Sequence, residues 1–235
     1  GDFAEINELF YQHASNGGKY QMKKLEQDEE VDEVEKHLTD DVVGIMGVNL
    51  LGVPADNLSL AKICKSKNLF FIEDNCESFG AKLNDQMCGT FGDVGTLSFF
   101  FSHHLQTMEG GAIITDCDDL ARFCRSLRAH GWTRDGDYSD MISDDRNSDF
   151  NKNFQFILPG FCVRPLEMSG AVGTIQLQKW GEQLARRESN YLYFKKEALK
   201  RDYLSMQVSR GHPSWFGFGV IFDKENKSTR DEIYE

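Results

Sequence analysis

Short apolar runs, separated by polar stretches, mark the first part of the chain with a clear pattern. The run "VVGIMGVNLLG" (residues 42–52) ends on a glycine, and "LFFIED" (69–74) follows it after the amphipathic stretch "SLAKICKSKN". Continuous apolar runs of this length are typical of strands buried on both faces. A strand, a helix and a second strand at this spacing predict a parallel pair with a right-handed crossover.

The same alternation continues along the chain. A glycine-rich loop, "GTFGDVG", leads into two further predicted strands, "TLSFFF" and "GGAIITD". A helix is predicted over 118–130, because its apolar side chains fall on one helical face. Residues 132–153 are polar and predict a long surface loop, a kind of segment that is often functional in compact domains.

The two ends of the chain are less regular. At the start, "LEQDEEVDEVEKHL" predicts an exposed helix within a polar segment. Later, "RPLEMSGAVGTIQLQKW" predicts the beginning of a long helix that runs toward residue 200, and "SWFGFGVIFD" predicts a last strand. The final residues, "STRDEIYE", predict the opening of a capped helix. Strands that alternate with helices in this way indicate an α/β protein.

Polar side chains follow the second and third predicted strands, where open α/β sheets bind their ligands. Asp74 ends one strand and Glu77 comes three residues later, while Ser98, His103 and His104 lie at the tip of the next strand. Each of these residues alone is also compatible with a structural role, such as a turn carboxylate or a packed histidine. A metal site is not expected, because the side chains of adjacent residues point apart.

Composition narrows the classes of function. A formal net charge of -12 argues against binding to nucleic acid or to an anionic membrane surface. No run of about 18 apolar residues and no signal peptide is visible, so no membrane span is predicted. The six cysteines form no C-x-x-C pair and predict free thiols in a reducing compartment, without an iron–sulfur cluster. A cytoplasmic protein is therefore expected.

Four stretches together resemble the DegT/DnrJ/EryC1/StrS family of sugar aminotransferases, which are fold-type-I enzymes dependent on pyridoxal 5'-phosphate. They are "FFIEDNCESFGA", "CGTFGDVGTLSFFFSHHLQTMEGGAIIT", "LRAHGWTRD" and "LPGFCVRPLEMSGAVGTIQL". The resemblance covers about residues 40–235 and implies an α/β, aspartate aminotransferase-like large domain with a mostly parallel sheet, incomplete at both ends. It implies three parts: a polar N-terminal segment over 1–40, a partial cofactor-binding domain over 41–190, and the start of a truncated small domain over 191–235.

The resemblance also implies a role for three of the polar residues. Asp74 occupies the position of the carboxylate that keeps the ring nitrogen of the cofactor protonated, which lets the ring accept electrons. Ser98 stands where a family hydroxyl binds the cofactor phosphate. Glu77 falls where aminotransferases of the family carry a glutamine near the ring hydroxyl.

The position of the cofactor-binding lysine gives the most specific indication. In the aminotransferases this lysine stands six residues before the glutamate of E-G-G, and counting back from Glu109 gives His103. The sequence has no lysine between Lys82 and Lys152. An imidazole cannot hold the cofactor covalently, but it can act as a general acid or base near neutral pH. This singles out His103 as catalytic and leaves His104 as a neighbour without a chemical role.

A histidine at this position resembles the dehydratase branch of the family, the 3-dehydratases of nucleotide-linked 4-keto-6-deoxy hexoses. The resemblance implies a noncovalently held cofactor, present as pyridoxal and pyridoxamine 5'-phosphate, and loss of the C3 hydroxyl of the sugar. Glutamate is the implied amino donor and a nucleotide sugar the substrate. The implied setting is deoxysugar biosynthesis, with lipopolysaccharide O-antigen as the commoner destination, and the family implies a homodimer.

Three departures from the family pattern are visible. No phosphate cradle is found in the N-terminal segment, the small domain stops at Glu235, and Cys162 replaces an asparagine that reaches the cofactor phosphate of the neighbouring subunit. They predict a fragment with weak cofactor binding. Two alternatives stay open: an aminotransferase of the same family, and an inactive homologue that acts as a dimerisation or binding module.

Overall fold

The computed structural model describes residues 31–142 and 154–222. Contacts between residues divide the chain into two compact units. Among the described residues, one unit contains 115–142 and 154–166, and the other contains 31–114 and 167–222. We call the first the α4 unit and the second the sheet unit. All four predicted site residues belong to the sheet unit, and the three-part division predicted from the sequence stays a prediction.

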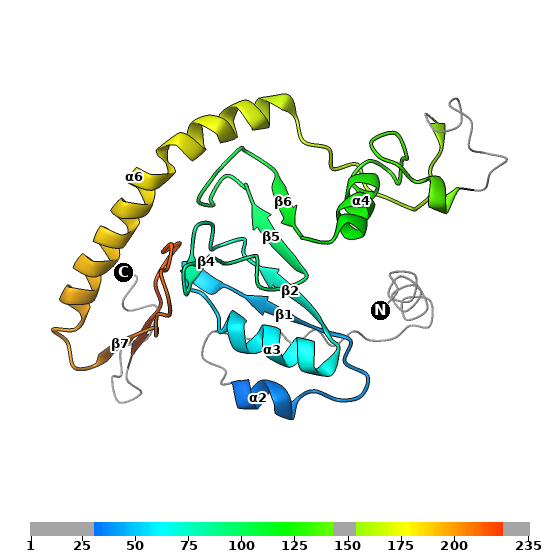
Figure 1. Cartoon of the computed structure of the whole chain (residues 1–235). Helices are drawn as coiled ribbons and strands as arrows, with labels where there is room; N and C mark the ends of the chain where they lie inside the picture. Colours follow the sequence, from blue (N-terminus) through cyan, green and yellow to red (C-terminus); the bar gives the residue numbers. More distant parts are fainter. Residues whose placement is uncertain (1–30, 143–153, 223–235) are drawn as a thin grey trace. The chain divides into compact units, whose positions relative to one another are not determined.

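The sheet unit is built on a four-stranded sheet with the order β1-β2-β5-β6 (Figure 1). Its strands are β1 (Gly44–Val48), β2 (Phe70–Asp74), β5 (Val94–Ser98) and β6 (Gly111–Ile114). The first three strands are parallel, and β6 runs antiparallel to β5. This confirms the mostly parallel sheet. It also confirms the predicted parallel pair, and it brings the carboxyl ends of β1, β2 and β5 to one edge.

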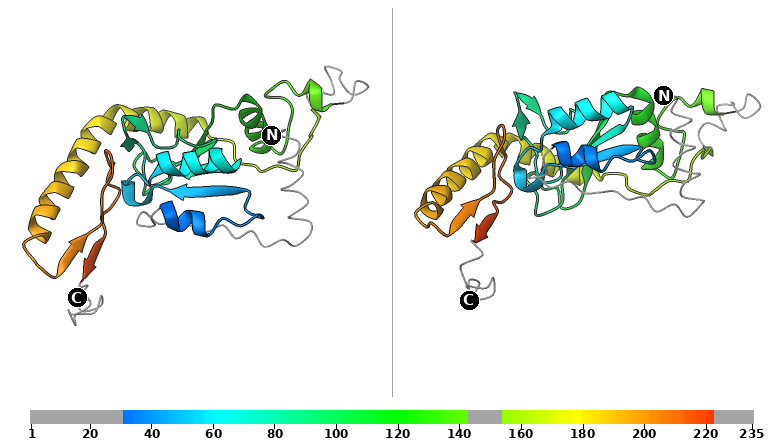
Figure 2. Two further views of the ribbon diagram at one scale, coloured as in Figure 1. Left: turned by 60° about the horizontal axis from the view of Figure 1, so that its bottom comes forward. Right: turned by 90° about the horizontal axis from the view of Figure 1, so that it is seen from below.

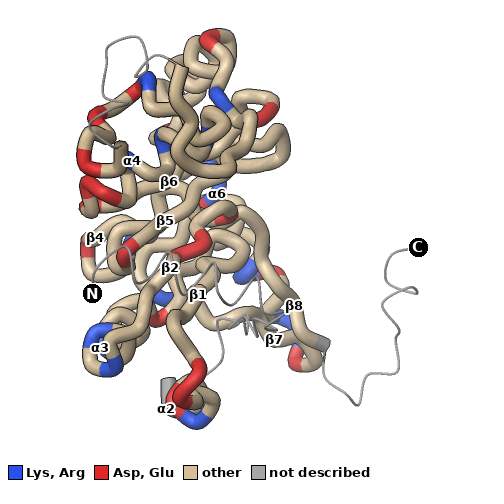
Figure 3. Tube along the Cα trace, turned by 90° about the vertical axis from the view of Figure 1, so that its right-hand side faces the viewer, with Lys and Arg blue, Asp and Glu red and all other residues tan. Residues whose placement is uncertain are grey.

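Two helices join the sheet through a shared apolar core. Helix α3 (Asn57–Lys67) contacts β1 and β2, and α2 (Val31–Lys36) lies beside α3 (Figure 2). The side chain of Asp56 caps the first turn of α3, and the lysines of its last turn lie at the negative end of the helix dipole (Figure 3). The core cluster consists of Val34, Ile45, Leu60, Ile63, Cys64 and Phe71.

The helix predicted over "LEQDEEVDEVEKHL" is described only from Val31. Its prediction as a wholly exposed helix is wrong at Val34, which is 4% exposed and belongs to the core. The side chain of Val34 therefore packs with residues of α3 and β1 instead of facing solvent.

Two predicted strands are shorter in the structure. The strand predicted over "TLSFFF" begins earlier, at Val94, and ends at Ser98, because the chain turns where His103 N donates to Phe100 O. Of "SWFGFGVIFD" only β8 (Val220–Phe222) is a strand. Trp215 has a positive φ of 46°, which is incompatible with an extended strand.

Some pairings were not predicted from the sequence. Strand β8 pairs with β7 (Leu204–Met206), and β3 (Lys82–Leu83) pairs with β4 (Gln86–Met87) in a small hairpin. The long helix α6 (Glu167–Ala198) agrees with the prediction of a helix toward residue 200. It contributes Tyr191 to a second core cluster.

The α4 unit contains α4 (Asp118–Leu127), which confirms the helix predicted there. The segment 132–153, predicted to be a surface loop, forms a short 3-10 helix over Ser139–Met141, and its later part lies outside the described residues. The capped helix predicted for "STRDEIYE" also lies outside them. Among the helices that the structure describes, none combines the length and apolarity needed to cross a membrane.

Candidate functional site

Asp74, the last residue of β2, lies at the carboxyl edge of the sheet and is half-buried. Its Oδ1 accepts a hydrogen bond from Cys76 N at 3.1 Å, and Thr96 Oγ1 on β5 lies 3.5 Å away. Both contacts involve Oδ1. Within the described part of the chain no hydrogen bond reaches Oδ2, so this oxygen can accept from a cationic N–H group of a ligand.

Glu73 precedes Asp74 and points to the other face of β2, where it is fully buried. Its carboxylate accepts main-chain N–H bonds from Gly89 at 2.8 Å, from Gly92 at 2.9 Å and from Phe91. Burial raises the pKa of Glu73 above its usual value, although the three N–H bonds act in the opposite direction. Glu73 thus holds the glycine-rich loop against β2. Sequence analysis missed this residue.

Glu77 lies in the turn after β2. Its Oε2 accepts the N–H of Leu51 at 2.9 Å. Leu51 belongs to the short 3-10 helix that follows β1 and has a positive φ of 56°, a conformation unusual for a branched side chain. The carboxylate therefore holds the turn after β1 in place, while the position near a ring hydroxyl that the family resemblance implies stays a prediction.

Buried asparagine side chains form hydrogen bonds that stabilise the turn after β1. Asn49, Asn57 and Asn75 are almost fully buried, and the side chain of Asn49 bonds those of both other asparagines. Ser78 adds a hydrogen bond to the main chain of Asn49. Apart from Asn57 Oδ1, which has no hydrogen-bond partner among the described residues, the network connects these buried groups, and such networks rigidify a site. The turns that follow β1 and β2 are consequently fixed with respect to each other.

Ser98 is the last residue of β5, and its Oγ accepts the N–H of Phe100 at 3.3 Å. Side chains two residues apart on a strand lie on the same face, so Ser98 shares a face of β5 with Thr96. Thr96 in turn touches Asp74. The structure therefore places the hydroxyl of Ser98 and the carboxylate of Asp74 along neighbouring strand ends.

His103 is half-buried in the turn after β5. Its ring packs against Phe100, with centroids 5.9 Å apart, and against Phe216 at 5.4 Å. Its Nδ1 atom is buried and has no hydrogen-bond partner among the described residues. A buried imidazole nitrogen without a partner is costly unless a ligand satisfies it.

His104 is more deeply buried than His103 and has one bonded ring nitrogen, although its Nδ1, like that of His103, has no hydrogen-bond partner among the described residues. It is 3% exposed, and its Nε2 lies 3.1 Å from Ser214 O. Burial lowers the pKa of His104 to about 4, and the positive charge of Arg187 acts in the same direction. A carbonyl oxygen only accepts, so Nε2 carries a proton, and the lowered pKa leaves the imidazole neutral at pH 7. This neutral, bonded state agrees with the expectation that His104 has no acid/base role.

The four predicted residues lie at the same edge of the sheet, at the ends of β2 and β5. No hydrogen bond joins any two of them directly in the described structure. A chain of contacts links Glu77 to His103, because Leu51 donates its N–H to Glu77 and accepts the N–H of Phe216, whose ring packs against His103. A carboxylate oxygen, a hydroxyl and an unpartnered imidazole nitrogen suit a ligand with a protonated ring nitrogen and a phosphate.

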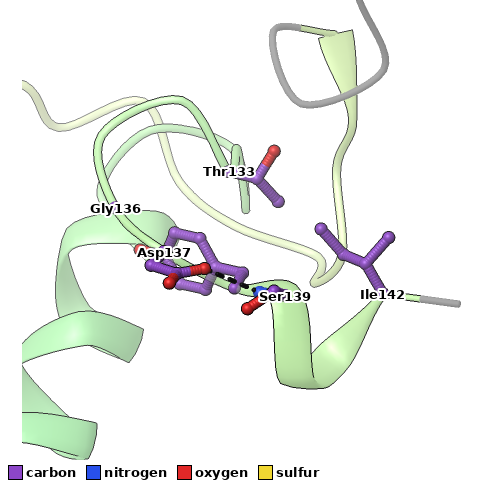
Figure 4. A pocket seen from close by; sticks show the side chains of 6 residues that line it. Thr133, Gly136, Asp137, Ser139 and Ile142 are labelled. Atoms are coloured by element: carbon purple, nitrogen blue, oxygen red, sulfur yellow. Dashed lines mark hydrogen bonds between the residues drawn. The ribbon is translucent and has the colours of Figure 1, made fainter. Parts of the chain in front are cut away.

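A pocket of about 250 Å³ lies in the α4 unit and contains none of the predicted site residues. Figure 4 shows its lining, in which Ser139 N donates to Asp137 Oδ1 at 3.0 Å. Ligand pockets usually have about 300–1,000 Å³. Cys162 lies in the same unit, is exposed and pairs with Ala129 in a main-chain bridge. Its predicted relation to a cofactor phosphate stays a prediction.

The sequence profile described as "DegT/DnrJ/EryC1/StrS aminotransferase family" matches residues 22–235. The chain is 43% identical over 205 residues to a GDP-4-keto-6-deoxy-D-mannose 3-dehydratase of Yersinia pseudotuberculosis, which covers 87% of this chain and 52% of that protein.

Two solved structures are similar in fold. An E. coli GDP-4-keto-6-deoxy-D-mannose-3-dehydratase with bound hydrated PLP superimposes with a TM-score of 0.78 at 40% identity, over 87% of this chain and 53% of that one. A GDP-4-keto-6-deoxymannose-3-dehydratase with a trapped PLP-glutamate geminal diamine gives a TM-score of 0.78 at 39% identity, over the same shares. The chain thus spans about half the length of the relatives it matches. The predicted aminotransferase-type fold is confirmed.

Proposed function

Because this chain belongs to the DegT/DnrJ/EryC1/StrS aminotransferase family, we propose that it takes part in a 3-dehydratase reaction dependent on pyridoxal 5'-phosphate. The substrate would be a nucleotide-linked 4-keto-6-deoxy hexose, and its C3 hydroxyl would be removed in deoxysugar biosynthesis. The relatives' substrate, GDP-4-keto-6-deoxy-D-mannose, is the first to test. The six cysteines, none of which is in a disulfide, support a reducing, cytoplasmic setting.

The carrying observation is the environment of His103. It occupies the position where an aminotransferase has its lysine, and its buried Nδ1 has no partner among the described residues. An imidazole cannot anchor the cofactor, but it can accept and return a proton. This favours a dehydratase over an aminotransferase, the second candidate.

The residues at the sheet edge suit the proposed cofactor. When bound, the cofactor supplies a conjugated ring that stores an electron pair. The Oδ2 atom of Asp74 would accept a hydrogen bond from the protonated ring nitrogen of the cofactor and stabilise its positive charge. The hydroxyl of Ser98 would donate to the phosphate. Glu77, already bonded to Leu51, would stand near the ring hydroxyl and fix the adjacent turn.

His103 would perform the proton transfer. It would take a proton at the carbon that joins the cofactor's amine, and the electron flow would expel the C3 hydroxyl of the sugar. The same imidazole, now protonated, can donate to the departing oxygen, which then leaves as water. His104 is less suited to this task, because it is 3% exposed and burial lowers its pKa to about 4, which makes it a weak base.

Glutamate closes the balance of atoms and electrons. Replacing the C3 hydroxyl by hydrogen reduces the sugar by two electrons, so an electron donor is required. Oxidation of glutamate to 2-oxoglutarate and ammonia supplies both electrons and takes up the oxygen atom that the sugar loses. The trapped PLP-glutamate species in a relative supports glutamate as the donor.

The experiment is to incubate the purified chain with pyridoxal 5'-phosphate, L-glutamate and GDP-4-keto-6-deoxy-D-mannose. We expect a sugar nucleotide lighter by one oxygen atom, together with equal amounts of 2-oxoglutarate and ammonia, by mass spectrometry and coupled assays. His103→Gln should lower the rate by about 10²–10⁴-fold, the usual contribution of a general acid or base.

Other products would contradict the proposal in distinct ways. An amino sugar formed without ammonia, with the cofactor fixed to a lysine by borohydride reduction, would establish an aminotransferase. Unchanged substrate and no cofactor absorbance would favour an inactive dimerisation or binding module. His130→Gln is a matched control, because His130 is an exposed histidine in the α4 unit.

A homodimer is part of the same proposal. Met168, Ile175 and Leu177 on the first half of α6 are each more than 50% exposed. Large apolar side chains clustered on one element mark an interaction surface. We expect Ile175→Glu together with Leu177→Glu to reduce the mass measured by sedimentation equilibrium from dimer to monomer. An unaltered chain that is already monomeric would contradict a homodimer.

A further inference from the structure

The segment Ser214–Gly217 crosses the carboxyl edge of the sheet, although it is far from the strands in sequence. Ser214 N donates to Gly52 O at 2.8 Å, and Phe216 N donates to Leu51 O at 3.0 Å. Both acceptors lie in the turn after β1. The segment is therefore fixed by its main chain to the turn that Glu77 also holds.

Helix α6 fixes the same segment from its other side. Arg187 Nη1 donates to Trp215 O at 2.9 Å, and the ring of Tyr191 stacks on Trp215 at an interplanar angle of 14°. Trp215 is 5% exposed. Aromatic stacking and a charge-assisted hydrogen bond rank among the stronger single contacts in a protein. These contacts hold Ser214–Gly217 in a fixed position beside the site.

His104 connects the segment Ser214–Gly217 to the turn after β5. Its Nε2–H donates to Ser214 O at 3.1 Å, and its ring meets Trp180 of α6 edge-on at 5.3 Å. The two residues of the hydrogen bond are separated by 110 positions in the sequence. A buried imidazole with one bonded nitrogen and a fixed ring plane leaves little freedom to the residues on either side of it.

Phe216 lies within ring contact of both histidines, with centroids 5.4 Å from His103 and 5.6 Å from His104. We infer that His104 is a positioning residue: it holds the Phe216 ring against the imidazole of His103. The inference rests on the proposed function, since it gives His104 the task of placing the group that moves the proton.

The need for such a device follows from the surroundings of His103. Its Nδ1 has no partner in the described structure, so ring packing against Phe100 and Phe216 sets its orientation. A general acid or base has to be held within hydrogen-bond reach of the proton it transfers. An imidazole that rotated away from Phe216 would lose this geometry while keeping its chemistry.

Two variants separate the hydrogen bond from the ring shape. His104→Phe keeps a ring against Trp180 but removes the donor to Ser214, whereas His104→Gln keeps a side-chain N–H donor of similar reach. His212→Phe is a matched control, because His212 is exposed, lies two residues before the segment and pairs with Lys82 through its main chain.

The first readout is the NMR spectrum of the His103 side chain, assigned by its loss in His103→Gln. In the unaltered chain its ring protons should show the shift caused by the neighbouring Phe216 ring. We expect His104→Phe to abolish this shift, and His104→Gln and His212→Phe to keep it. An unchanged shift in His104→Phe would overturn the inference without affecting the proposed function.

The second readout is kinetic. We expect His104→Phe to lower kcat about tenfold with KM unchanged, a loss of the size that one ordinary hydrogen bond supplies, and His104→Gln to recover most of it. Absence of turnover by the unaltered chain would contradict the proposed function, and the NMR readout would still decide the inference. If His104→Phe does not fold, Phe216→Leu removes the same ring contact, and a His103 spectrum unaffected by that change overturns the inference.

Discussion

The ends of β2 and β5 have a similar arrangement of ionisable residues. Each carries two adjacent ionisable residues of one kind, Glu73 and Asp74 on β2 and His103 and His104 after β5. In each pair one member is buried and hydrogen-bonds a main-chain group distant in sequence, and the other member is half-buried. The buried member anchors the chain, and its neighbour is the one proposed to take part in the chemistry.

The two ends differ in how far the anchor reaches. Glu73 bonds N–H groups that lie 16 to 19 residues away, in the loop that leads into β5. His104 bonds a carbonyl 110 residues away, in the segment beyond α6. The end of β2 is therefore fixed within the sheet, whereas the end of β5 depends on distant parts of the chain. The proposed acid/base group is on the end with the more distant support.

The largest expected effect concerns the local anchor. Glu73→Gln leaves at least one buried main-chain N–H of the glycine-rich loop facing an amide NH₂ instead of a carboxylate oxygen. We expect a loss of about 4 kcal/mol in the free energy of unfolding, since an unsatisfied buried donor costs about 1–3 kcal/mol and charge-assisted bonds are lost as well. Urea denaturation measures it.

Glu188→Gln is the matched control for this change, because Glu188 is exposed on α6 and should give a difference within about 0.5 kcal/mol. An equal stability of Glu73→Gln and the unaltered chain would show that Glu73 is not an anchor, and the comparison between the two strand ends would fail.

The distant anchor predicts a dependence of stability on pH. The pKa of His104 is lowered from 6.5 to about 4 in the fold, mainly by burial and further by Arg187, with His103 as a neighbour of like charge. As the pH falls below 6.5 the unfolded chain binds this proton first, so folding loses stability down to pH 4. The stability contributed by a neutral His104 is thus present above pH 6.5 and lost on acidification.

The measurement compares the unaltered chain with His104→Gln, which does not titrate. Between pH 7 and pH 4 the unaltered chain should lose about 3 kcal/mol more than the variant, from the linkage of one displaced pKa. Parallel loss in both proteins would place the pKa of His104 near its ordinary value and would contradict its burial as a neutral side chain.

The elements whose signals are local could be predicted from the sequence, as the apolar runs predicted β1 and β2. The spacing to Glu109 singled out His103, whose catalytic role stays a prediction. Glu73 was missed because a charge inside "FFIED" looks like an interruption of an apolar strand. Its compensation comes from main-chain groups, which leave no trace in the identity of side chains.

The role of His104 was missed for a different reason. Its partner is a carbonyl at Ser214, and no residue type or spacing reveals a contact over that separation. The strand predicted over "TLSFFF" ran too far because aromatic residues favour strands, although the chain already turns at Phe100. Contacts between residues far apart in the sequence, not local propensity, determine both the environment of His104 and the end of β5.

A change at Asp74 should weaken cofactor binding and have little effect on the stability of the fold. Asp74→Asn replaces the carboxylate that would hold the ring nitrogen of the cofactor. We expect the affinity for pyridoxal 5'-phosphate, measured by absorbance titration, to fall about 50-fold, as for a lost charge-assisted hydrogen bond of 1.5–3 kcal/mol. Asp85→Asn, at the exposed tip of the β3–β4 hairpin, should leave it unchanged. Stronger binding to Asp74→Asn would remove Asp74 from the proposed site.

The smallest expected effect tests what holds Asp74 itself. Thr96 Oγ1 lies 3.5 Å from Asp74 Oδ1, at the limit of a hydrogen bond, whereas Cys76 N donates to the same oxygen at 3.1 Å. If the main-chain N–H sets the orientation of the carboxylate, Thr96→Val should change cofactor affinity by less than about threefold, under 0.7 kcal/mol. A loss as large as that of Asp74→Asn would mean that a side chain on the neighbouring strand orients Asp74. The end of β2 would then depend on side-chain support from another element, as the end of β5 does, and the two strand ends would no longer differ in this respect.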